Sequence, residues 1–359
     1  MTKNCLAVAG LALLPALASA EEVRVYNWSD YIDESILEQF EQETGIKVIY
    51  DVFDTNETLE TKMLTGGSGY DVVVPTHNFL SRQIQAGVFA KLDQSLLPNR
   101  ENLWEDIKQR VEQFDPGNSY SVNYMWGTTG IATVSELVDA RMEDAPIDSW
   151  SILFNPEIAA KFQDCGIHVL DDPTEIIPAA LIYLGHDGNS RDPKHLAEAE
   201  ELLLQMRPFV QKFHSSNYVT AIADGDICVA VGYSGDVLQA RDTADEADNG
   251  VTVQYRVPVE GSQMWFDQMA IPADAPNKEG AHRFINFIMR PEIAAAATNY
   301  VYYANGNKAS QPLLEEDVIT DPAIYPTEET VANLFVHKPY DAKTLRRVNR
   351  IWTRVKTGQ

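Results

Sequence analysis

The sequence predicts an α/β fold built on mostly parallel sheets, with enough chain for two lobes. Strand-like and helix-like periodicities alternate over residues 23–78, and such alternation is typical of parallel sheets flanked by helices. About 340 residues follow the first twenty, and 45% of the chain is hydrophobic, which suffices for two separate cores. No internal repeat or flexible linker interrupts the chain, so closely joined lobes are expected.

The first twenty residues predict a signal peptide. Lys3 precedes an apolar run over residues 6–17, and Ala18-Ser19-Ala20 has the small-residue pattern of a cleavage site. A membrane anchor is the alternative, but Pro15 interrupts the run, which is shorter than the roughly 20 residues of a span. We expect export and a soluble mature protein.

The mature chain begins with a predicted βαβ unit. Val23–Tyr26 alternates like a strand, and Ile32, Ile36 and Phe40 have helical spacing. Gly45 is a helix stop, and Ile46–Tyr50 resumes extended structure.

A second unit follows. The sequence predicts a helix over Thr58–Leu64, a turn over residues 66–69 and a buried strand over Asp71–Val74. Ligands of parallel sheets bind outside the carboxyl ends of strands. Ser29-Asp30 and Thr76 to Asn78 follow two such ends.

Two later extended runs are expected to cross between the lobes. One is Tyr124–Gly130, where small residues follow aromatic ones, and the other is Val251–Val257. Residues 281–288 have helical spacing that ends before Pro291.

Acidic groups beside aromatic rings recur along the chain and predict a site for an organic cation. Asp30 lies between Trp28 and Tyr31, Tyr233 is followed by Asp236, and Trp265 by Asp267; Asp172 and Glu175 add two further acids. The formal charge of −25 would repel nucleic acid.

Two cysteines, Cys165 and Cys228, remain after the leader. An even number in an exported chain predicts a disulfide, and two separately buried thiols are the alternative. Their spacing indicates neither redox nor zinc chemistry.

Five motifs occur in the order found in one known family. They are Tyr26-Asn27-Trp28-Ser29-Asp30-Tyr31, Asp71-Val72-Val73-Val74-Pro75, Tyr124-Met125-Trp126, Gly225-Asp226-Ile227-Cys228 and Tyr303-Ala304-Asn305. The chain resembles the periplasmic putrescine- and spermidine-binding receptors of bacterial ABC-type polyamine importers. The resemblance implies a hinged periplasmic binding protein fold of type II, with the ligand in the cleft and no catalytic activity. It also implies delivery to an inner-membrane ABC permease with its ATPase, action as a monomer, and no cofactor or metal.

The lobes are expected to comprise residues 21–126 with 258–310, and residues 127–257 with part of 311–359. The family's ligand-binding positions match thirteen residues of this chain. They are Trp28, Ser29, Asp30, Tyr31, Thr76, Asn78, Asp172, Glu175, Tyr233, Asp236, Trp265, Asp267 and Tyr303.

Spermidine is the expected ligand, with putrescine bound more weakly. Relatives that prefer spermidine tend to have Trp and Asp at the positions of Trp265 and Asp172, and spermidine's third amine favours additional acids. A putrescine-preferring receptor of the same family is the alternative.

Two other classes of function are less well supported. The adjacent Tyr302 and Tyr303 resemble the tyrosines of ferric-ion receptors, but no basic residues near these motifs would hold a synergistic anion. An enzyme is not expected, because Gly232-Tyr233-Ser234-Gly235-Asp236 has Asp where a nucleophile elbow requires Gly.

Overall fold

The computed structural model describes residues 21–358. The predicted leader lies outside them. The strands are β1 (Glu22–Trp28), β2 (Lys47–Phe53), β3 (Val72–Val73), β4 (Ser121–Val134), β5 (Ile167–Val169), β6 (Lys212–Phe213), β7 (Val229–Tyr233), β8 (Val253–Arg256), β9 (Ser262–Ala270), β10 (Ala304–Asn305) and β11 (Leu334–Val336). The longer helices are α1 (Glu34–Thr44), α2 (Asn56–Thr65), α3 (His77–Gln85), α4 (Glu105–Glu112), α8 (Pro173–Tyr183), α9 (Pro193–Met206), α11 (Ser234–Ala247), α12 (Lys278–Ile288), α13 (Pro291–Val301) and α16 (Ala342–Thr357). The shorter helices are α5 (Ser135–Asp139), α6 (Ser151–Phe154), α7 (Pro156–Ala159), α10 (Tyr218–Ala223), α14 (Glu316–Thr320) and α15 (Glu328–Ala332).

The predicted βαβ opening is present. Strand β1 pairs in parallel with β2 on one side and with β3 on the other. The Asp33 side chain caps α1 by accepting a hydrogen bond from the Ser35 amide. Gly45 ends α1 with φ 71°, a left-handed conformation that glycine adopts without a Cβ clash.

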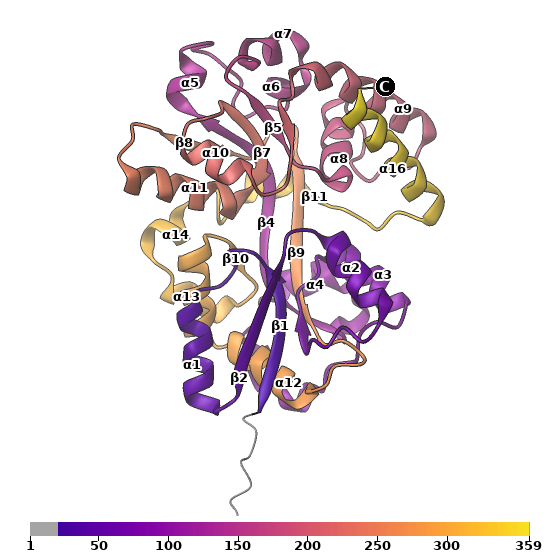
Figure 1. The fold of residues 1–359 in the computed structure, drawn as a ribbon, viewed down its shortest axis with the longest axis vertical. Helices are drawn as coiled ribbons and strands as arrows, with labels where there is room; N and C mark the ends of the chain where they lie inside the picture. Colours follow the sequence, from indigo (N-terminus) through magenta and orange to yellow (C-terminus); the bar gives the residue numbers. More distant parts are fainter. Residues whose placement is uncertain (1–20, 359) are drawn as a thin grey trace, which may run out of the picture.

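The strands form one mixed sheet flanked by helices, with β4 and β9 as long vertical strands at its centre (Figure 1). Strands β5, β6 and β7 pair in parallel, like β1 to β3. By contrast, β4 runs antiparallel to β7, β8, β9 and β10. The parallel pairing that the sequence predicts is therefore found between β1 and its neighbours, between β5 and its neighbours, and between β9 and β11.

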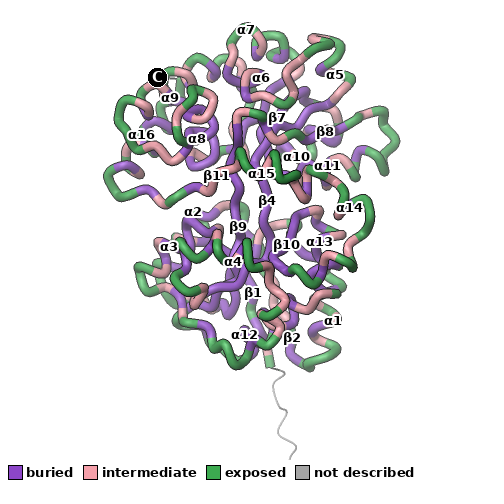
Figure 2. The backbone as a smooth tube through the Cα atoms, turned by 180° about the vertical axis from the view of Figure 1, so that it is seen from behind, coloured by how far each residue is buried: buried purple, intermediate pink, exposed green. Residues whose placement is uncertain are grey.

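The second crossing differs from the expected one. Strand β8, within the predicted run Val251–Val257, pairs only with the last residues of β4, Ile131 to Val134. The crossing strand is β9, which pairs with the first half of β4, from Ser121 to Thr128, and reaches β3 through Ala270. All residues of β4 and β9 are buried. Figure 2 draws both strands in purple, the colour of buried residues.

Apolar side chains gather into separate cores. One contains Phe40 of α1, whose ring lies 5.3 Å from the rings of Phe284 and Phe287 in α12. Another, at the opposite end of β4, includes Trp150 and Tyr218, both fully buried. Burying one such ring contributes roughly 1.5 to 3 kcal/mol.

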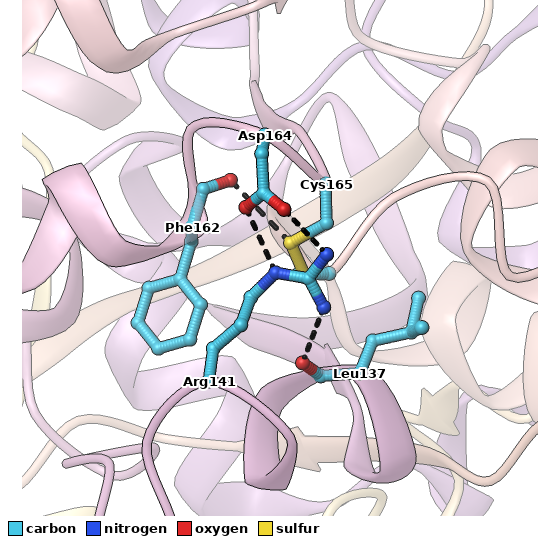
Figure 3. The surroundings of a disulfide bond; sticks show 6 residues. Leu137, Arg141, Phe162, Asp164 and Cys165 are labelled. Carbon is cyan, nitrogen blue, oxygen red and sulfur yellow. Dashed lines mark hydrogen bonds and ion pairs between the residues drawn. A yellow bond between two sulfur atoms is a disulfide. The ribbon is translucent and has the colours of Figure 1, made fainter.

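The predicted disulfide between Cys165 and Cys228 is confirmed, with a Cα–Cα distance of 5.5 Å. Each cysteine lies just before a strand of the parallel β5–β7 pair. Figure 3 shows Cys165 beside Asp164, whose carboxylate accepts two hydrogen bonds of 2.8 Å from Arg141. The cross-link spans 63 residues and contributes roughly 4 kcal/mol in the chain-entropy model.

No helix within residues 21–358 is long and apolar enough to cross a membrane.

Candidate ligand-binding site

A cavity of about 390 Å³ lies where the carboxyl ends of β1 and β3 face the first turns of α8 and α11. All thirteen residues that the sequence predicts for the site line it. They are Trp28, Ser29, Asp30, Tyr31, Thr76, Asn78, Asp172, Glu175, Tyr233, Asp236, Trp265, Asp267 and Tyr303.

The segment after β1 turns sharply into the cavity. Asp30 has φ 52°, an unusual conformation that Asp tolerates better than most residues. Trp28 is fixed by its indole N–H, which donates to the Val74 carbonyl at 2.9 Å. The Ser29 hydroxyl donates to Asp54 at 2.9 Å. Ring and acid therefore occupy defined positions at one wall.

Asp267 of β9 is held by two hydroxyl groups. Its carboxylate accepts hydrogen bonds from the Thr76 hydroxyl at 2.7 Å and from the Tyr31 hydroxyl at 2.9 Å. Asn56 in turn donates to Thr76 at 3.0 Å. Burial raises the pKa of Asp267 to about 7, although the two hydroxyl donors favour its charged form.

Asp236, in the first turn of α11, is held by two tyrosines. Its carboxylate accepts hydrogen bonds from Tyr303 at 2.5 Å and Tyr218 at 2.8 Å, and its amide donates to Tyr303 at 3.0 Å. Burial raises the pKa of Asp236. The position near a helix N-terminus favours a negative charge.

Two acids belong to the start of α8. Asp172 caps the helix by accepting from the Thr174 amide at 2.7 Å. Glu175 accepts from Thr129 at 2.7 Å and from Gln263 at 2.5 Å. Burial, and then the nearby charge of Asp172, raise the pKa of Glu175 well above its usual range. Burial also raises the pKa of Asp172. A cation bound between Asp172 and Glu175 would offset the free-energy cost of ionising both carboxyl groups.

Aromatic rings form a continuous wall. The Trp265 ring lies 5.7 Å from Tyr233 and 5.4 Å from Tyr303, and Tyr303 lies 5.1 Å from Tyr31, all edge to face. Gly235 permits this packing, because a Cβ there would lie 2.4 Å from the Tyr303 ring. The buried indole N–H of Trp265 has no hydrogen-bond partner within residues 21–358.

The charge of the lining is one-sided. Six lining residues carry carboxylates, and none of the described lining residues is Lys, Arg or His. The carboxylates are Asp30, Asp54, Asp172, Glu175, Asp236 and Asp267. Buried acids without a basic partner require a cation, or protonation, to be accommodated.

Sequence reasoning did not include ten further lining residues. They are Asp54, Asn56, Thr174, Ser215, Ser216, Asn217, Val219, Thr220, Gln239 and Gln263. Asp54 and Asn56 follow β2, so the strand-end rule could have found them. The serines at 215 and 216 belong to a loop whose composition is that of any surface turn.

The two adjacent tyrosines lie in different surroundings. Tyr303 lines the cavity, whereas Tyr302 ends α13 with φ 57° and is absent from the lining. Within residues 21–358, no group of three or more His, Cys, Asp or Glu residues could hold a metal ion. Of the two adjacent tyrosines, Tyr303 alone therefore lies at the cavity.

Known proteins are similar to this chain over nearly its whole length. The putrescine-binding periplasmic protein SpuD of Pseudomonas aeruginosa is 52% identical over 353 residues, 98% of this chain and 95% of the relative. The putrescine-binding periplasmic protein PotF of Escherichia coli is 46% identical, over 95% of this chain and 93% of the relative. A putative spermidine/putrescine ABC transporter structure from Listeria monocytogenes superposes with a TM-score of 0.83, at 35% identity over 94% of this chain and all of that one.

The family model described as bacterial extracellular solute-binding protein matches residues 35–327. The chain therefore belongs to the bacterial extracellular solute-binding proteins, which are receptors rather than enzymes.

Proposed function

We propose that this protein is a periplasmic polyamine receptor that prefers putrescine and delivers it to an ABC permease and its ATPase. The observation that supports this most is the cavity, in which six carboxylates and several aromatic rings surround a space without a basic side chain. Export, signal cleavage and action as a monomer are parts of the same proposal.

The cavity chemistry matches a diamine. Each ammonium group needs acceptors that replace its water, and its methylenes need apolar walls. A charge-assisted hydrogen bond contributes roughly 1.5 to 3 kcal/mol, and an ammonium over an aromatic face roughly 0.5 to 2. A few such contacts reach the −8 kcal/mol of micromolar binding after ordering costs. We assign them to the thirteen predicted residues.

Putrescine, rather than spermidine, is the ligand that we propose to bind more tightly, which reverses the expectation from sequence. The relatives at 52% and 46% identity are named as putrescine-binding, whereas those named as spermidine/putrescine-binding are 35% to 36% identical. The packing of Trp265 supports the change. Its ring lies against Tyr233 and Tyr303, so a large residue there builds the wall and need not indicate a longer ligand.

Ligand capture would close the two lobes about β4 and β9. We propose that one lobe comprises residues 21–126 with 258–310 and the other 127–257 with part of 311–359. The packing of α16 against α8 and α9 supports placing the C-terminal helix with the second group. Ligand favours closure because its ammonium groups contact acids from both groups, among them Asp267 and Asp236.

Calorimetric titration of the ligand-stripped protein, first with putrescine and then with spermidine, tests the proposal. Tighter binding of putrescine is expected. Asp236→Asn should weaken it at least tenfold, because a charge-assisted hydrogen bond is lost. Asp245→Asn is the matched control on the same helix, since Asp245 is exposed and outside the cavity. No heat with either amine would refute the polyamine assignment, and tighter spermidine binding would refute only the preference.

A further inference from the structure

The C-terminal helix α16 is basic in a strongly acidic chain. The whole chain has 53 acidic and 28 basic side chains. Helix α16 contains no acid and carries six basic residues, namely Lys343, Arg346, Arg347, Arg350, Arg354 and Lys356.

One face of α16 is fixed to the body of the protein. Val348, Ile351 and Val355 are buried, and the helix packs against α8 and α9. Its other side borders a groove of about 700 Å³ at the start of α9, whose lining also includes Arg191 and two acids, Glu200 and Asp341, the latter paired with Arg191 at 3.9 Å. Figure 1 shows α16 at the outer edge of the molecule.

Contacts within the protein account for half of the basic residues. Arg347 donates to the Pro193 carbonyl at 2.7 Å. Arg354 pairs with Glu200 at 2.6 Å and Lys356 with Asp171 at 2.8 Å. The last two also lie in the final turn, where the helix dipole favours positive charge.

No contact of this kind explains the remaining three basic residues of α16. The side chains of Lys343, Arg346 and Arg350 are exposed and form no hydrogen bond or ion pair within residues 21–358. Their spacing of three and four residues places like charges side by side on the helix, which destabilises it. Lys343 and Arg346 also lie in its first half, toward the positive end of the dipole. We call these three residues the basic stripe. No contact within residues 21–358 explains why they are basic.

We propose that the basic stripe binds the surface of a bilayer that contains anionic phospholipids. Arg side chains match phosphate groups by paired hydrogen bonds, and the groove provides room for headgroups. No large apolar side chain is exposed on α16, whereas the core of a protein interface needs apolar or aromatic anchors. An anionic surface would repel the rest of the chain, so it would orient the molecule with α16 toward the membrane.

Sedimentation with phosphatidylglycerol-containing vesicles and with pure phosphatidylcholine vesicles tests this proposal. The parent protein should bind only the anionic vesicles, and 0.5 M salt should abolish the binding by screening. The triple variant Lys343→Gln, Arg346→Gln, Arg350→Gln should bind on the order of 100-fold more weakly, since each basic residue near such a surface contributes about 1 kcal/mol.

The matched control removes three exposed lysines elsewhere, as Lys47→Gln, Lys161→Gln, Lys308→Gln. It changes net charge equally and should bind vesicles like the parent. Neither variant should melt below the parent, and both should retain its putrescine affinity, which separates this proposal from the ligand assignment. Equal losses in both variants, or no binding by the parent, would overturn it. Stabilisation of the parent, but not the stripe variant, by inorganic phosphate in the absence of vesicle binding would instead indicate a free phosphate site.

Discussion

Replacing Asp267 by Asn should weaken ligand binding and yet stabilise the ligand-free protein. The buried carboxylate has a pKa of about 7, against 3.8 for an ordinary Asp. The difference of about 3 pKa units corresponds to as much as about 4 kcal/mol of destabilisation once the group is ionised. Asn keeps the size of the side chain and can still hydrogen-bond the hydroxyls of Thr76 and Tyr31.

The sign of the effect depends on pH. Because burial raises the pKa of Asp267, the cost is absent below pH 3.8, grows as the pH rises to about 7 and is constant above it. Ligand-free Asp267→Asn should therefore melt above the parent at pH 8 and match it near pH 4. Its putrescine affinity at pH 8 should be roughly 10- to 150-fold lower, since a charge-assisted hydrogen bond is lost.

Scanning fluorimetry at both pH values and calorimetry at pH 8 measure the two effects. Asp106→Asn, at an exposed residue of α4 outside the cavity, should change neither. A ligand-free Asp267→Asn protein that is less stable than the parent at pH 8 would refute the cost assigned to the buried charge. Unchanged putrescine affinity would refute the assignment of this carboxylate to the ligand.

Three further predictions concern the site and the fold. Putrescine affinity should fall from pH 8 to pH 5, because Asp267, whose pKa is about 7, must lose its proton to bind a cation; calorimetry in buffers of different ionisation enthalpy should detect proton release, and a flat profile would contradict this. Changing Cys165 and Cys228 to Ser should lower the free energy of unfolding in urea by about 4 kcal/mol, and an unchanged midpoint would exclude a stabilising cross-link. Asp172→Ala should weaken spermidine binding more than putrescine binding, because the third amine of spermidine needs a further acid, and an unaltered ratio of affinities would dissociate Asp172 from amine selectivity.

Local signals predicted the first part of the fold well. The alternation of Val23–Tyr26, the helical spacing that follows and the left-handed Gly45 depend on residues close in sequence. The central strands could not be found in this way. An extended run such as Val251–Val257 has the same pattern whether its strand is short or crosses the molecule, and the pairing of β9 with β3 and β4 joins residues more than a hundred positions apart.

The site likewise has features that the sequence predicts and features that depend on distant segments. Acids beside rings could be recognised from their types and from the family resemblance, and all thirteen predicted residues line one cavity. The contacts that support these acids could not be recognised from the sequence. Asp267, for example, is held by Tyr31 and Thr76, which come from distant segments. Gln263, which donates to Glu175, resembles any polar residue of a strand until its partner is known.

Strand β4 has a mechanical consequence for the molecule. Its first half pairs with β9 and its second half with β7 and β8, and a register irregularity lies between Asn123 and Trp126. Any rotation of one half of the protein against the other must bend β4 together with β9, which crosses beside it. Gly127 lies beside the irregularity, and a Cβ there would meet the Trp265 ring at 2.7 Å. Gly127 therefore lies next to both the irregular part of β4 and the Trp265 ring of the cavity wall. Substitutions at Gly127 would alter the kinetics of opening and the shape of the pocket together.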